Sequence, residues 1–147
     1  MRIEYKDEIL QTPEKVFPWI AEPEKAMQWQ KNVMGGEIIV NNPEIIGTTF
    51  REIIEENGKQ LEMQGIITKY VENKIIGFHL ESKIHEFDVI YSIVGLGEAT
   101  KLSIEADIKW KFPINIISKF MGKRMAEALK KQMESEVQKL KILCEKA

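Results

Sequence analysis

Alternation of apolar and polar residues in EATKLSIEADIKWKF, residues 98–112, constrains the fold more than any other feature. Two sets of side chains alternate there: the apolar Leu102, Ile104, Ala106, Ile108 and Trp110, and the polar Lys101, Ser103, Glu105, Asp107 and Lys109. A period of two is typical of a β-strand with one dry face and one wet face. A sheet built from such strands must bury its dry face, so the sequence predicts a second layer that covers the sheet.

The segment that follows Pro113 supplies such a layer. Apolar residues recur there in steps of three and four: Ile114, Ile117, Met121, Met125, Leu129, Met133, Val137, Leu140 and Cys144. This spacing predicts one amphipathic helix, about 50 Å long at the usual rise per residue. A coiled coil is the alternative for a helix of this length, but four-residue steps drift away from a strict seven-residue seam. We therefore expect a single long helix that covers the sheet.

The rest of the sheet is expected from several shorter runs. Residues 2–9 alternate in the same way as residues 98–112. Turn signals separate five further apolar runs: residues 37–47, 48–59, 60–74, 75–83 and 85–97. Asn57-Gly58 predicts a tight hairpin turn, and Gly35-Gly36 is interpreted as another turn. The sequence thus predicts seven antiparallel strands.

The segment TPEKVFPWIAEPEKAMQWQ, residues 12–30, interrupts the alternation. Thr12 is a helix-capping residue, and Pro13 is favoured at the first helical position, where its missing N–H would have had no partner. Pro18 disfavours a straight continuation of the helix, and Glu22-Pro23 offers a second start. The segment therefore predicts two short helices separated by a bend.

This order of elements, together with three features of the sequence, resembles the START-related superfamily SRPBCC, which includes polyketide cyclases, the birch pollen allergen and lipid-transfer domains. The features are TPEKVFPWIAEPEKAMQW at residues 12–29, Gly47 before a strand, and MESEVQKLKILCE at residues 133–145. The resemblance covers nearly the whole chain and implies one domain, residues 1–147, with an α+β helix-grip fold. That fold has a curved seven-stranded antiparallel sheet, two short helices after strand one, and a long C-terminal helix that covers the sheet. It says little about function, because these features lie at structural corners.

The resemblance also implies an apolar cavity between sheet and C-terminal helix, with an entrance near the short helices and the start of the long helix. From the strand and helix phases, we expect these residues to line the cavity and bind a ligand: Trp29, Phe50, Met63, Phe78, Phe87, Tyr91, Ile104, Trp110, Met121, Met125, Leu129 and Met133. Methionine is flexible and polarizable, so a helical stripe of it adapts to varied apolar ligands, although it fills gaps in ordinary cores equally well. The leading hypothesis is binding of a hydrophobic small molecule: a lipid, a polyketide or an aromatic metabolite.

Catalysis is the alternative hypothesis. His85 shares its strand phase with Phe87 and Tyr91, and Asp7 shares the phase of the apolar residues in its own strand. His85, Tyr91 and Asp7 are therefore candidates for an acid–base group of a polyketide cyclase or dehydratase-like enzyme. Against this hypothesis, His85 stands at the start of a strand, where exposure to solvent is expected.

Composition argues against several other classes of function. The net charge of −2 on 147 residues makes no field that would recruit nucleic acid or anionic lipid. The two histidines, His79 and His85, fall on opposite faces, and Cys144 is the only cysteine, so neither a metal nor another cofactor is expected. Glu134 and Glu136 on the long helix are interpreted as solvated carboxylates.

The expected location and partners follow from the same composition. No apolar run is long enough for a signal peptide or a membrane span, which predicts a cytoplasmic protein without membrane insertion. We expect a monomer or a weak homodimer. A third hypothesis is a module that binds a protein partner through the outer helix or a sheet edge, because the superfamily also includes co-chaperone domains.

Overall fold

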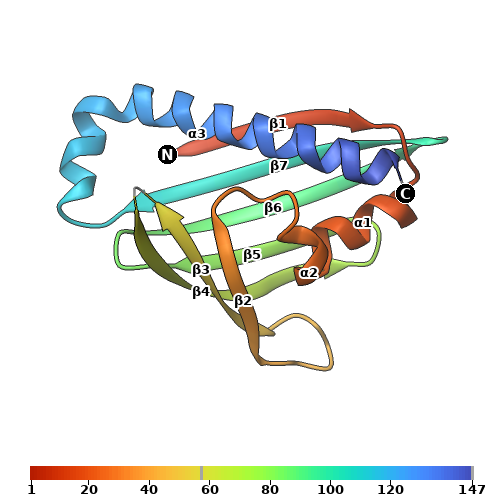
Figure 1. The fold of residues 1–147 in the computed structure, drawn as a ribbon, viewed down its shortest axis with the longest axis horizontal. Helices are drawn as coiled ribbons and strands as arrows, with labels where there is room; N and C mark the ends of the chain where they lie inside the picture. Colours follow the sequence, from red (N-terminus) through yellow and green to blue (C-terminus); the bar gives the residue numbers. More distant parts are fainter. Residues whose placement is uncertain (57, 147) are drawn as a thin grey trace.

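Strands from both ends of the chain lie side by side in one curved antiparallel sheet (Figure 1). The computed structural model describes residues 1–56 and 58–146, and in these the elements are β1 (Arg2–Ile9), α1 (Pro13–Ala21), α2 (Pro23–Ala26), β2 (Val33–Val40), β3 (Thr49–Glu56), β4 (Lys59–Val71), β5 (Ile75–Glu81), β6 (His85–Leu96), β7 (Ala99–Trp110) and α3 (Ile114–Glu145). The order across the sheet is β1-β7-β6-β5-β4-β3-β2. The predicted helix-grip fold class is confirmed.

The alternation in β7 sorts its side chains as the sequence predicts. Leu102, Ile104 and Ala106 are buried, whereas Lys101 before them and Glu105 among them are exposed. Strand β7 is central to this end of the sheet, because β1 pairs along one edge and β6 along the other. The dry face of β7 therefore meets the layer formed by the helices.

Helices α1 and α2 form where two short helices separated by a bend were expected. Pro18 lies inside α1, which continues to Ala21, so Pro18 does not end the helix. The helix ends at Glu22 instead, whose backbone is extended because Pro23 follows it. Thr12 takes the N-cap position with its backbone carbonyl accepting from Lys15 and Val16, while its side chain makes no capping hydrogen bond.

The glycine pair Gly35-Gly36 belongs to β2 and not to a turn, so that interpretation is wrong. The reversal before β2 occurs at Asn32, which adopts a left-handed backbone conformation. A Cβ atom on Gly36 would lie 3.0 Å from the carbonyl oxygen of Arg51 in β3, so glycine here permits close strand pairing. In the predicted hairpin after β3, Gly58 has a φ of +76°, while Asn57 lies outside the described residues.

Helix α3 packs across β1 and β7 with its C-terminal half, where Val137, Leu140 and Cys144 are fully buried. Its first turns run at a steep angle to the rest of the helix and leave the sheet uncovered there (Figure 1). Phe120, in these turns, is 86% exposed. Helix α3 therefore covers only part of the sheet. Among the described residues, no helix is long and apolar enough to span a membrane.

The core fills one end of the space beneath α3. Ile9 of β1, Val16 of α1, Leu102 of β7 and Leu140 of α3 meet there with almost no exposed surface. The Thr100 hydroxyl donates to the carbonyl oxygen of Gln11 at 2.7 Å, so the buried hydroxyl is satisfied. The concave face of the sheet beyond this core is left for a cavity.

Candidate functional site: a cavity with an acidic polar cluster

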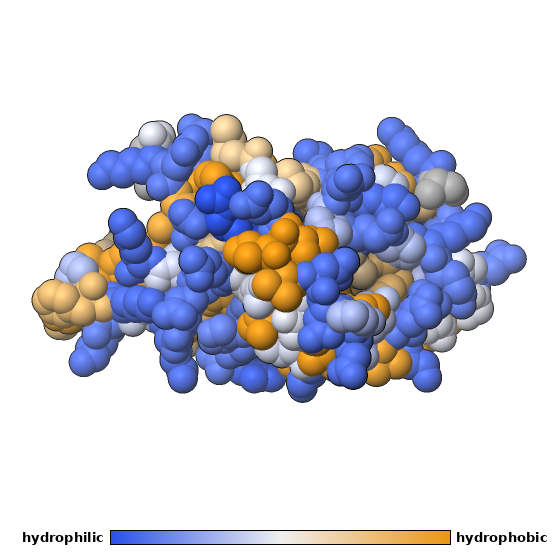
Figure 2. Space-filling model, turned by 90° about the horizontal axis from the view of Figure 1, so that it is seen from below, coloured by the Kyte–Doolittle hydropathy of each residue, from blue (hydrophilic) through white to orange (hydrophobic). Residues whose placement is uncertain are grey.

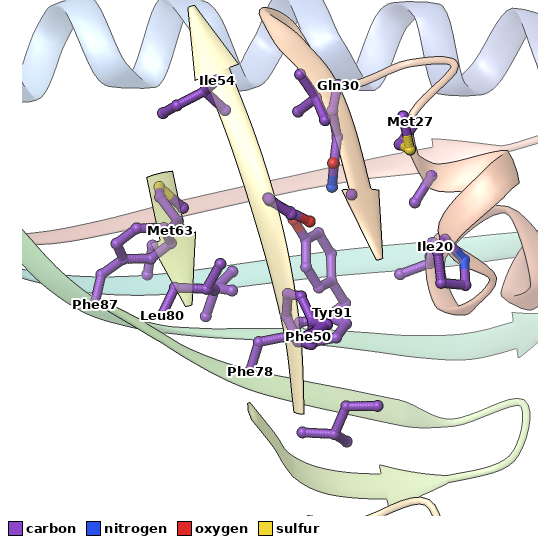
Figure 3. A pocket seen from close by; sticks show the side chains of 18 of the residues that line it. Ile20, Met27, Gln30, Phe50, Ile54, Met63, Phe78, Leu80, Phe87 and Tyr91 are labelled. Carbon is purple, nitrogen blue, oxygen red and sulfur yellow. The ribbon is translucent and has the colours of Figure 1, made fainter. Parts of the chain in front are cut away.

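A cavity of about 820 Å³ occupies the concave side of the sheet. Its walls come from strands β2 to β7, from α2 and the loop that follows it, and from one face of α3. Figure 3 shows side chains from several strands pointing into this space, among them Phe50, Phe78 and Tyr91. The volume falls in the usual range for sites that enclose a small molecule.

A row of aromatic rings crosses the cavity floor. The ring centroids of Phe50 and Phe78 are 5.7 Å apart, those of Phe78 and Tyr91 are 6.2 Å apart, and those of Tyr91 and Trp29 are 6.2 Å apart. All three contacts are edge-to-face, a favourable arrangement for aromatic pairs. The Trp29 indole N–H donates to the Trp19 carbonyl at 2.7 Å, which fixes one end of the row.

Gly65 makes the contact between Phe50 and Phe78 possible. Phe50 of β3 lies opposite Gly65 of β4, and Phe78 belongs to the next strand, β5. A Cβ atom on Gly65 would lie 2.3 Å from Cζ of Phe50, so the ring passes directly over this glycine. The absence of a side chain on β4 therefore lets Phe50 reach across it.

Most residues predicted to line the cavity do so: Phe50, Met63, Phe78, Phe87, Tyr91, Trp110, Leu129 and Met133. Four others lie outside its wall: Trp29, Ile104, Met121 and Met125. Trp29 packs behind Tyr91, and Ile104 is buried in the core because its part of β7 faces the packed end of the sheet. Met121 is 44% exposed, since the first turns of α3 do not cover the sheet. Binding of a ligand by these residues stays a prediction.

The three candidate catalytic residues are not brought together. The His85 ring lies in the cavity wall, stacked on Trp110 with centroids 5.2 Å apart, and its Nδ1 is 2.6 Å from the Ser82 hydroxyl. Tyr91 lies six residues further along β6, about 20 Å away at the usual strand rise. Their positions on the strand therefore prevent a direct acid–base pair.

Asp7 lies away from the cavity, under the C-terminal part of α3. It accepts hydrogen bonds from the Tyr5 hydroxyl at 3.1 Å and from Lys141 Nζ at 3.3 Å. Partial burial opposes its charge, but the hydrogen bonds from the Glu8 amide, Tyr5 and Lys141 outweigh burial and lower the pKa of Asp7. This arrangement is that of a structural ion pair between β1 and α3.

Two carboxylates that the sequence interpretation overlooked lie in the cavity wall. Glu136 was expected to be solvated, but burial raises its pKa more than the hydrogen bonds from Lys31 and Gln132 lower it. Burial also raises the pKa of Glu52 on β3. A signal for Glu52 was present in the sequence, because it shares the inward phase of Phe50 in an alternating strand.

Tyr91 lines the same cavity as these two carboxylates. The side chain is deep in the molecule, and the surface that it retains faces the cavity. Burial, together with the charges of Glu136 and Glu52, raises the pKa of Tyr91 well above its ordinary value. In Figure 3 the Gln30 amide extends into the same space as the Tyr91 ring. We call Glu52, Tyr91 and Glu136 the acidic polar cluster.

A group of potential metal ligands lies elsewhere, near the paired ends of β5 and β6. Ligand atoms of His79, Glu81 and Glu86 are within 4.8 Å of one another. His79 is 2.9 Å from Asp88, and Glu81 accepts from Lys111 at 2.8 Å, so both have protein partners. Ion pairing at a surface is sufficient to explain this geometry.

Apolar side chains are also exposed on two parts of the surface. One is formed by β2 and the loop after it, on the side seen in Figure 2, where apolar residues gather amid hydrophilic ones: Ile38, Ile39, Val40, Ile45 and Ile46. The other lies at the start of α3, and we call it the α3 apolar surface: Phe112, Ile116, Ile117, Phe120 and Met121. Clustered exposed apolar side chains are typical of interaction surfaces.

Comparison with known families matches residues 11–143 to the family described as Activator of Hsp90 ATPase homolog 1-like protein. A comparison with curated proteins finds no match. The match to the family model spans nearly the whole chain, including the cavity wall.

Several solved structures share the fold. The protein TTHA0849 from Thermus thermophilus has a TM-score of 0.81 at 16% identity, covering 98% of this chain and 97% of the other. A START superfamily protein from Mycobacterium smegmatis has a TM-score of 0.68 at 20% identity, covering 90% and 97%. The Zhui aromatase/cyclase from Streptomyces sp. R1128 has a TM-score of 0.80 at 11% identity, covering 99% and 93%. Together with the family match, these likenesses confirm the START-related superfamily that the sequence resembles.

Proposed function

Because this chain belongs to the Activator of Hsp90 ATPase homolog 1-like family and encloses a cavity of about 820 Å³, we propose that it binds an apolar or amphipathic small molecule there. The observation that carries the proposal is the row of aromatic rings formed by Phe50, Phe78 and Tyr91, which lines the cavity on the concave face of the sheet and is backed by Trp29. Lipids, polyketides and aromatic metabolites are the ligand classes that fit such a wall.

Burial of apolar surface supplies the affinity. Each 100 Å² of apolar surface removed from water contributes about 2.5 kcal/mol before the cost of association is subtracted. The aromatic contacts hold the wall in place without a ligand, so little ordering is required on binding. Polar groups in the wall then set the orientation of the ligand.

Binding is favoured over a cyclase or dehydratase reaction by the placement of the catalytic candidates. His85 and Tyr91 lie at different points of the cavity wall, and Asp7 is engaged with Lys141 outside it. The likeness in fold to an aromatase/cyclase supports a related ligand shape more than a shared reaction, because fold alone does not determine chemistry. A cytoplasmic protein, monomeric or weakly dimeric, is part of the same proposal.

The experiment that tests the proposal has two arms. Material extracted by organic solvent from the purified, folded protein is identified by mass spectrometry, with an equal amount of an unrelated protein as control. The protein is then titrated with N-phenyl-1-naphthylamine, a neutral dye whose fluorescence rises in apolar surroundings. We expect saturable dye binding at one site per chain, and absence of both extracted ligand and dye binding would contradict the proposal.

A second candidate function, binding of a protein partner, is favoured by the α3 apolar surface. Phe112 and Phe120 are 75% and 86% exposed. Contact with a partner would remove their apolar surface from water and so stabilise the complex. The family description names an activator of the Hsp90 ATPase, so Hsp90 is the partner to test first. A rise in Hsp90 ATPase rate with this protein, lost in Phe120→Ser, would support this function.

A further inference from the structure

The acidic polar cluster assembles from three separate elements of the fold. Glu52 comes from β3, Tyr91 from β6 and Glu136 from α3, and all three line the same cavity. Contacts place them in the same part of the wall. Glu52 stands two residues after Phe50, whose ring reaches Tyr91 through Phe78. Glu136 is bonded to Lys31, the residue after Gln30, whose amide extends beside the Tyr91 ring (Figure 3). The curvature of the sheet explains this, because β3 and β6 are separated by β4 and β5 in the strand order.

Part of the hydrogen-bonding capacity of the cluster is unused. Within the part of the chain that the structure describes, neither the Tyr91 hydroxyl nor the Glu52 carboxylate has a hydrogen-bond or ion-pair partner. Glu136 has partners, because its Oε2 accepts from the Lys31 backbone amide at 2.6 Å and its carboxylate also accepts from Gln132. A ligand that forms hydrogen bonds with the Tyr91 hydroxyl and the Glu52 carboxylate therefore gains affinity.

The charge of the cavity wall is negative. Its acidic residues are Glu22, Glu24, Glu37, Glu52 and Glu136, against the basic Lys25, Lys31 and Arg51. Arg51 pairs with Glu37 and Glu62, at 3.1 and 3.6 Å. Lys25 pairs with Glu22 at 3.6 Å and lies over the Trp19 ring. The charge of Lys31 acts on Glu136, so Glu52 is the carboxylate of the cluster that is left without a cation.

A ligand could present one of three polar head groups to this cluster: a carboxylate, a hydroxyl or an ammonium group. A carboxylate would face two other carboxylates and be repelled, and a hydroxyl would leave the charge of Glu52 uncompensated. An ammonium carries one positive charge and three donors, which matches two carboxylates and a phenol oxygen. The rings of Tyr91 and Phe78, which line the cavity beside it, add a favourable environment for a cation.

We propose that the cavity selects amphipathic amines, a proposal that rests on the proposed cavity function. The ammonium is held by Glu52, Tyr91 and Glu136, and the apolar body lies along the aromatic row. The ligand class is an alkyl or arylalkyl amine. Selectivity comes from the cluster, whereas the apolar wall supplies most of the affinity.

Displacement of N-phenyl-1-naphthylamine by three ligands of equal chain length tests this proposal: decylamine, 1-decanol and decanoate, at pH 7.5 and below the concentrations at which they form micelles. We expect decylamine to displace the dye at concentrations at least tenfold lower than either of the others. In Glu52→Gln and in Tyr91→Phe, dye binding should persist while the preference for decylamine falls at least fivefold. Glu62→Gln, on the neighbouring strand outside the cavity wall, is the matched control and should keep the preference.

The outcomes separate the two proposals. Dye binding with equal displacement by all three ligands would overturn the amine selectivity and leave the cavity function standing. An unchanged preference in both Glu52→Gln and Tyr91→Phe would also overturn it, and either variant suffices should the other fail to fold. Absence of dye binding by the wild-type protein would overturn the cavity function and the amine selectivity together.

Discussion

Glu136 of α3 accepts a hydrogen bond from the backbone amide of Lys31, 105 residues earlier in the chain, with the Oε2 and N atoms 2.6 Å apart. This bond ties the long helix to the loop that connects α2 and β2. Both residues line the cavity, so the bond fixes one part of its wall.

Glu136→Ala should loosen that loop. Loss of this solvent-exposed hydrogen bond is expected to lower the free energy of unfolding by about 1 kcal/mol. Amide hydrogen exchange at Lys31 is the direct measurement, and it should become at least tenfold faster. Glu136→Gln retains an acceptor and should remain close to wild type, as should Glu134→Ala on the exposed side of the same helix. Equal exchange rates in Glu136→Ala and wild type would show that the bond does not restrain the loop.

Leu129→Trp should fill part of the cavity from the side of α3. The larger side chain occupies space that a ligand would use, so dye affinity should fall at least tenfold. The melting temperature should stay within about 3 °C of wild type, because a cavity accepts added volume that a packed core would not. Met125→Trp, one helical turn away and outside the wall, is the matched control. Unchanged affinity in Leu129→Trp would place the binding site elsewhere.

Local patterns in the sequence were sufficient to predict the fold. Alternation around Leu102 predicted β7, and the three- and four-residue steps from Ile114 to Cys144 predicted α3. Both elements are present in the structure. Gly35-Gly36 misled because glycine permits both a turn and the close approach of two strands. Only the contact with Arg51 of β3 decides between them.

The polar groups of the cavity wall could not be predicted from the sequence, because their positions depend on contacts between residues far apart in the chain. Glu136 is one of many glutamates on α3, and its role depends on Lys31 and on the curvature of the sheet. Asp7 shared the inward phase of β1 but found Lys141 as its partner. Neither pairing leaves a periodic signal in the sequence. Glu52 is different, because its alternation with Arg51 in β3 predicts a side chain that points inward. It was overlooked because only apolar residues were expected to line the cavity.

Gly65→Ala should disrupt the aromatic row. The added Cβ would lie 2.3 Å from Cζ of Phe50, so the ring must leave its position against Phe78. We expect a loss of about 1–3 kcal/mol in the free energy of unfolding, measured by urea denaturation. Gly35→Ala meets no atom within 4 Å and serves as the control for replacing a strand glycine. Phe50→Leu combined with Gly65→Ala should recover part of the loss, and failure to do so would assign it to the backbone.

Glu52→Gln should change stability in a pH-dependent way. Burial raises the pKa of Glu52 in the folded protein above its value in the unfolded chain, so folding favours the protonated form. Its contribution to stability is therefore complete below the unfolded pKa and is lost as the pH rises through the folded pKa. Glutamine mimics the protonated form at every pH. The variant should melt at a higher temperature than wild type at pH 7.5, and the difference should disappear in acid.

Melting temperatures measured across this pH range provide the test, with Glu62→Gln as the control. Glu62 is exposed and pairs with Arg51, so its replacement removes a weak surface ion pair and should give no gain at pH 7.5. Added decylamine should stabilise wild type more than Glu52→Gln, because the ammonium compensates a charge that only wild type carries. A melting temperature of Glu52→Gln equal to or below that of wild type at pH 7.5 would show that the carboxylate is solvated, and would remove the electrostatic basis for amine selectivity.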